Sequence, residues 1–79
     1  MIEQDQGQVI ANMKKNTVEE ILFTLREYKG HRLVDIRVYT DAEDYQGPTK
    51  KGICLRIEQL PEFMDCLEKV QRALKEGQN

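Results

Sequence analysis

Aromatic and basic side chains stand close together at three places in the chain. Tyr28 directly precedes a lysine, Arg37 stands two residues before Tyr39, and Lys50 and Lys51 form a basic pair before an apolar run. Aromatic rings stack on the exposed faces of unpaired nucleic-acid bases, while lysine and arginine pair with phosphates. These residue types therefore indicate a surface suited to a single-stranded polyanion.

The total charge hides this feature, because the 79-residue chain has a formal net charge of -2. Residues 26–57, however, carry seven basic and five acidic side chains, and three of the five acids cluster at Asp41, Glu43 and Asp44. Charge asymmetry along a chain is more informative than the total when one face does the binding. We therefore expect the binding face to lie in this central segment.

Enzymatic chemistry is not predicted. The sequence has no nucleophile with a neighbouring base, no glycine-rich phosphate loop and no paired catalytic carboxylates. His31 has no ligand partners at useful spacing, and Cys54 and Cys66 are interpreted as reduced packing residues, so neither a metal nor a cofactor is expected. With no run long enough to span a membrane, we expect a cytoplasmic, nucleoid-associated protein.

The elements that would position these side chains are short strands and one helix. We predict strands at Val9–Met13, Val18–Tyr28, Arg32–Thr40 and Gly52–Ile57, with a polar loop before the last strand that closes in residues 47–51. Alternation of apolar and polar residues supports the second and third strands. A two-residue turn at Lys29-Gly30 predicts antiparallel partners whose numbers have a constant sum. The predicted pairs are Tyr28 with His31, Leu25 with Val34, Phe23 with Ile36, and Ile21 with Val38.

This register divides the sheet into two faces. One face is apolar, and the other presents Arg26, Tyr28, Arg37 and Tyr39, joined by Arg56 from the last strand. Lys50 and Lys51 are placed at the rim, with Lys51 on the parity of the apolar face. Asp35 shares the polar face and is expected to orient Arg37 rather than to contact a ligand. A simple ion pair of Arg37 with Asp35 or Glu20 is the alternative.

A C-terminal helix is predicted from Glu58 to about Glu76, because apolar residues recur there at steps of three and four. The predicted fold is α+β: a curved four-stranded antiparallel sheet whose apolar face is covered by this helix. Residues 1–8 are expected to be a loose lead-in, and residues 9–77 a single domain. A core this small is marginally stable, so self-association is the expected stabiliser.

Three segments together resemble the positive cofactor four family of transcriptional coactivators, specifically its short bacterial relatives. They are YKGHRLVDIRVY at residues 28–39, PTKKGICL at residues 48–55 and EQLPEF at residues 58–63. The resemblance covers about residues 18–74. It implies a homodimer whose helices pack across the twofold axis, and a groove that binds single-stranded DNA with little sequence preference.

The resemblance also implies which residues contact the nucleic acid. Positions matching the family pattern are Tyr28, Lys29, Arg37, Lys50 and Lys51, with Arg26 as a further candidate. Two departures reduce the match, because Thr40 stands where relatives can carry a large aromatic residue and His31 stands where better-known members have lysine. We therefore expect one stacking ring fewer and a weaker or more salt-sensitive site, unless Tyr39 or Tyr45 substitutes.

Two alternatives stay open on the sequence. Stacking and phosphate contacts do not distinguish DNA from RNA without a group that reads the 2′-hydroxyl. The chain could also be a protein-interaction module that recruits transcription or repair proteins through its acidic helix and dimer surface. In either case we expect a homodimer and no membrane partner, with a role in transcription, replication or repair.

Overall fold

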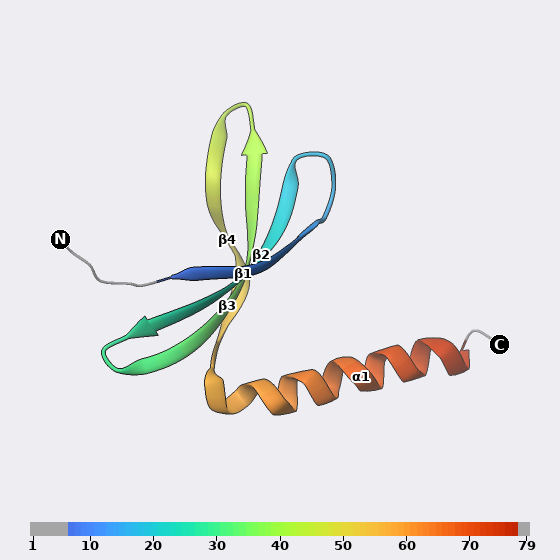
Figure 1. Ribbon diagram of the computed structural model, residues 1–79. Helices are drawn as coiled ribbons and strands as arrows, with labels where there is room; N and C mark the ends of the chain where they lie inside the picture. The colour runs from blue at the N-terminus through green and yellow to red at the C-terminus, as the bar shows by residue number, and fades with distance from the viewer. Residues whose placement is uncertain (1–6, 78–79) are drawn as a thin grey trace.

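The computed structural model describes residues 7–77 as one open sheet followed by a helix (Figure 1). The elements are β1 (Gln8–Lys14), β2 (Glu19–Tyr28), β3 (His31–Ala42), β4 (Tyr45–Arg56), the 3₁₀ turn η1 (Ile57–Gln59) and α1 (Leu60–Gly77). Neighbouring strands are antiparallel in the order β1-β2-β3-β4. The predicted α+β fold class is confirmed. The lead-in predicted for residues 1–8 falls mostly outside the described residues.

The β2–β3 hairpin has the predicted register. Tyr28 pairs with His31, Leu25 with Val34, and Ile21 with Val38. Both turn residues have positive φ, 52° at Lys29 and 80° at Gly30, as a two-residue hairpin turn that follows the twist of the strands requires. Alternation of residue types was sufficient to predict this pairing, because a slip of one position would exchange the two faces.

The predicted polar loop between the third and fourth strands is wrong. β3 continues to Ala42 and β4 begins at Tyr45, so the turn is only Glu43 and Asp44. Pro48 lies inside β4, where it is tolerated because β4 is an edge strand. The register shifts between Arg37 and Tyr39, which places a β-bulge in the facing part of β4. The long strands bend, and the β2–β3 and β3–β4 hairpins project in different directions from the middle of the sheet (Figure 1).

The predicted covering of the sheet by the helix is also wrong for a single chain. α1 packs mainly against η1 and then extends away from the sheet (Figure 1). No residue of α1 is buried, Ile53 of the apolar face is 44% exposed, and Val34 and Val38 are the buried apolar residues of the described chain. An amphipathic stripe shows that a helix face needs a partner, but it does not specify which surface that partner is.

Candidate nucleic-acid interface

Strand pairing places most of the predicted contact residues on one side of the sheet, which we call the polar face. Residues directly opposite each other on neighbouring strands share a face. Four cross-strand rows follow from the register of β2, β3 and β4: Glu20–Tyr39–Pro48, Leu22–Arg37–Gly52, Thr24–Asp35–Cys54 and Arg26–Leu33–Arg56, with Tyr28–His31 as the last pair. The face therefore carries basic and aromatic side chains along its length.

A buried carboxylate lies at the centre of the polar face. Asp35 is only 4% exposed. Its Oδ1 and Oδ2 accept hydrogen bonds from Nη2 and Nε of Arg37 at 2.8 and 3.1 Å, and Nε of Arg26 lies 4.0 Å from Oδ2. Asp35 therefore contacts Arg37 as expected, and the same contact is the ion pair that the alternative interpretation of Arg37 named. These hydrogen bonds raise the pKa of Arg37 above its ordinary value.

The β2–β3 turn forms one end of the polar face. Tyr28 is 53% exposed, and the ammonium of Lys29 lies 5.4 Å from the centre of its ring. Lys29 has a left-handed backbone conformation, which is sterically unfavourable for a residue with a Cβ atom. An exposed ring beside a cation is the arrangement that a stacked base and its phosphate require.

The two lysines before the last apolar run both lie in the bulge, because residues 49–51 stand between Pro48, which pairs with Tyr39, and Gly52, which pairs with Arg37. Nζ of Lys51 lies 3.7 Å from Oε2 of Glu19, and Glu19 has the β2 parity of Ile21, on the apolar side. Lys50 is exposed, and the bulge interrupts the alternation that assigns side chains of β4 to a face. The structure therefore places Lys51 beside Glu19 and leaves Lys50 exposed in the bulge.

The remaining tyrosine has a local role. Tyr45 pairs with Ala42 on the side opposite to Tyr39, and its hydroxyl donates to the Pro48 carbonyl at 2.6 Å. Its ring also lies against Gly47. Tyr45 is therefore folded onto its own hairpin, and Tyr39 is the tyrosine that shares the polar face with Tyr28.

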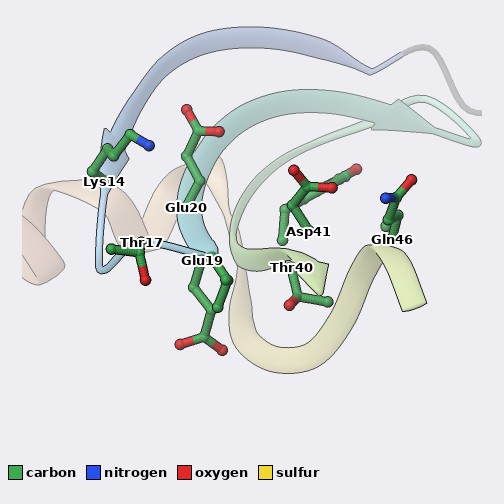
Figure 2. A pocket seen from close by; sticks show the side chains of 10 residues that line it. Lys14, Thr17, Glu19, Glu20, Thr40, Asp41 and Gln46 are labelled. Atoms are coloured by element: carbon green, nitrogen blue, oxygen red, sulfur yellow. The ribbon is translucent and has the colours of Figure 1, made fainter. Parts of the chain in front are cut away.

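A pocket of about 340 Å³ lies beyond Tyr39, between the β1–β2 turn and the β3–β4 hairpin. Figure 2 shows Lys14 and Glu20 at one side of it and Asp41 with Gln46 at the other. The side chain of Asn12 donates a hydrogen bond to Glu20. Because acidic groups surround this pocket, it is unfavourable for phosphate.

Sequence patterns missed one residue that shapes this surface. Thr49 lies in the bulge, where its Oγ1 donates to the Val38 carbonyl at 2.8 Å and its own carbonyl accepts from Nη1 of Arg37 at 3.1 Å. A glycine shortly after a polar residue in a strand can indicate a bulge, and Gly52 supplied that signal. Within residues 7–77, no group of three or more potential metal ligands comes together, and no helix is long and apolar enough to cross a membrane.

An open antiparallel sheet with a cationic, aromatic face and a single trailing helix defines a class of small nucleic-acid-binding proteins. Residues 15–66, more than half of the chain, match the family model described as Transcriptional Coactivator p15 (PC4). The chain belongs to this family. Membership supports DNA binding and a coactivator-like role, and the family is described by transcription rather than by catalysis.

Solved structures agree with this assignment. The chain resembles a PC4 homolog from Burkholderia pseudomallei in its orthorhombic crystal form, with 32% sequence identity and a TM-score of 0.76 over 90% of this chain and 97% of that one. The tetragonal form of the same homolog gives 31% identity and a TM-score of 0.74 over 84% and 98% of the two chains. No curated protein matches the chain.

Proposed function

We propose that this protein is a homodimer that binds single-stranded DNA with little sequence preference and supports transcription, replication or repair at the nucleoid. The polar face is the proposed binding surface. Its proposed residues are Arg26, Tyr28, Lys29, Arg37, Tyr39, Lys50, Lys51 and Arg56.

The observation that carries the proposal is the end of the polar face around the β2–β3 turn. An exposed tyrosine ring lies there beside Lys29, and Arg26 and Arg56 belong to the neighbouring cross-strand row. A base of an unpaired strand can stack on the ring while its phosphates meet the cations. A duplex hides the faces of its bases, so the same surface offers it only phosphate contacts.

Unpartnered apolar surface supports the homodimer. Met64, Leu67, Val70 and Leu74 follow one another along one face of α1 and are 50–63% exposed, and Ile53 on the apolar face of the sheet is also exposed. Removing such side chains from water contributes roughly 1 kcal/mol each when they are half exposed at the start. A second copy of the chain carries the same exposed helix stripe and the same exposed sheet face. Two copies can therefore bury these surfaces against each other in a twofold interface.

Fluorescence anisotropy with a labelled mixed-sequence single strand and the corresponding duplex tests the binding proposal. The single strand should bind more tightly, and the logarithm of its association constant should fall with the logarithm of salt concentration by about 0.7 per phosphate contacted. Absence of binding at low salt, or equal affinity for the duplex, would overturn the proposal. A matched RNA strand in competition decides between DNA and RNA.

The exposed stripe of α1 also favours a second function, the recruitment of a transcription or repair protein. Pull-down after nuclease treatment separates this function from DNA binding. A partner that is retained by the wild type but lost by variants of the stripe would support recruitment through α1. Loss of every partner on nuclease treatment would instead assign the association to DNA.

A further inference from the structure

The pocket beyond Tyr39 continues the polar face. Lys14 of β1 pairs with Glu20, and Glu20 pairs with Tyr39, so these three residues form one cross-strand row. Asp41 lies two residues further along β3, on the same face as Tyr39, and pairs with Gln46. A strand bound along the polar face can therefore reach this pocket, whose volume of about 340 Å³ is within the usual range of small-ligand sites.

Three carboxylates line the pocket, and two of them already have partners. Those of Glu19 and Glu20 accept hydrogen bonds from side chains of the β1–β2 hairpin. Within residues 7–77, the side chains of Asp41 and Gln46 make neither a hydrogen bond nor an ion pair, and Lys14 at the other side of the pocket makes none either (Figure 2). The pocket therefore presents free acceptors at one side and a free ammonium at the other.

Guanine is the DNA base that matches this arrangement. Its Watson–Crick edge has two neighbouring donors, N1–H and the N2 amino group, which one carboxylate can accept together, while its O6 and N7 are neighbouring acceptors that suit an ammonium. Adenine and cytosine place a donor beside an acceptor on the same edge, and thymine has one N–H between two carbonyls. A carboxylate therefore pairs with two groups of guanine but with only one group of any other base.

We propose that this pocket is a guanine-selective base site, in which Asp41 accepts from N1–H and the N2 amino group and Lys14 donates to O6 or N7. Tyr39 also lines the pocket and supplies a ring on which the base stacks. This inference rests on the proposed function, since it adds a base preference to the polar face. A preference at one nucleotide is compatible with little sequence preference over the whole strand.

Fluorescence anisotropy with labelled dT strands of equal length tests the preference, because one central substitution changes a base and no phosphate. We expect a strand with one dG to bind about fivefold more tightly than the all-dT strand, and strands with one dA or dC to stay within about twofold of it. Deoxyinosine in place of dG lacks the N2 amino group and should lose most of the gain. Equal affinities of the dG and all-dT strands would overturn the proposal.

Asp41→Asn tests the acceptor, because asparagine has a similar size but replaces one acceptor oxygen with a donor. The ratio of affinities for the dG and all-dT strands should fall from about five to about one, whatever the lost charge does to affinity in general. Asp44→Asn makes the same change of charge in the β3–β4 turn, outside the residues that line the pocket, and should keep the ratio. An unchanged ratio in Asp41→Asn would contradict the proposed pairing.

Lys14→Gln removes the ammonium at the other side of the pocket. It should lower the same ratio about twofold, because guanine loses a partner for its acceptors while thymine loses none in the pocket. Lys75→Gln, which removes a lysine from α1, is the control and should leave the ratio unchanged. Equal ratios in the two lysine variants would remove Lys14 from the site.

A titration with free nucleosides separates this inference from the proposed function. 2′-Deoxyguanosine carries the base without a phosphate, and in NMR spectra it should shift the backbone amide signals of Asp41 and Gln46 more than thymidine does at the same millimolar concentration. Equal or absent shifts would overturn the guanine site even if the protein binds single strands. Selective shifts in a protein that binds no strand would instead defeat the proposed function and support the base site.

Discussion

Tyr28 provides the most direct test of the proposed base stacking. Its ring is open to solvent and carries the Lys29 ammonium over it, and its hydroxyl is not needed for stacking. We predict that Tyr28→Ala weakens single-strand binding by about 1–3 kcal/mol. Because no charge is removed, the slope of affinity against salt should stay the same.

Tyr28→Phe is the matched control, since it keeps the ring and removes only the hydroxyl. Anisotropy titrations at two salt concentrations measure both quantities for each variant. The stacking interpretation fails if the alanine variant binds as tightly as the wild type, or if phenylalanine is as damaging as alanine.

Gly52 is the residue on which the shape of the bulge depends most directly. A Cβ atom at this position would lie 2.4 Å from the Ile36 carbonyl oxygen and 2.8 Å from the Arg37 Cα. Both are backbone atoms, so β3 and β4 would have to move apart. We predict that Gly52→Ala lowers the free energy of unfolding by about 2 kcal/mol, measured by urea denaturation.

Gly77 provides the comparison for that experiment, because a Cβ there meets nothing within 4 Å. Gly77→Ala at the end of α1 should change the unfolding free energy by less than about 0.5 kcal/mol. Similar stabilities for the two alanine variants would show that the close approach at Gly52 is relieved without cost.

At the scale of elements, the β1–β2 turn is organised by one carboxylate. Glu19 accepts hydrogen bonds from the side chains of Asn16 at 2.8 Å and Lys15 at 3.1 Å, and these bonds hold the pKa of Glu19 below its ordinary value. The side chain of Asn16 also accepts from the backbone N–H groups of Val18 and Glu19. The turn is thus a local network that depends on an ionised Glu19.

This network predicts a pH dependence. A carboxyl whose pKa is lower in the folded state stabilises the fold above its unfolded pKa, and the contribution is lost as the pH falls through the folded pKa. Between neutral pH and about pH 3, the wild type should therefore lose more stability than Glu19→Gln does. Asn16→Ala should raise the pKa of Glu19 in an NMR titration, because it removes the largest cause of the shift. An unchanged pKa in that variant would contradict the network.

Strand pairing was predictable from the sequence where residue alternation was strict, as between Leu25 and Val34 in the β2–β3 hairpin. The start of β4 was not predictable, because Gly47 and Pro48 are typical of loops and an edge strand can still accommodate both. The bulge that contains Lys50 and Lys51 also lacks a periodic signal. It arises from hydrogen bonds of Arg37 and Thr49 across strands, and such contacts are visible only once the register is known.

At the scale of the whole molecule, a single chain leaves its two apolar surfaces without partners. The sequence showed that the stripe of α1 had to be buried, and chain length indicated that one core would be marginal. Neither observation specified the partner, since an amphipathic helix can pack on its own sheet or on another chain. The structure removes the first possibility within residues 7–77, because α1 extends away from the sheet (Figure 1).

The homodimer can therefore be tested through this stripe. We predict that the wild type sediments as a dimer at micromolar concentration and that the double variant Leu67→Gln with Val70→Gln shifts to monomer, because two apolar side chains leave the interface. The control, Arg72→Gln with Lys75→Gln, changes two side chains of α1 outside the stripe and should stay dimeric. If dimerisation joins two polar faces into one longer site, the wild type should gain affinity when the single strand is lengthened. The monomeric variant should gain less from the same lengthening. A wild type that stays monomeric at this concentration would contradict the dimer and leave the stripe of α1 to a different protein.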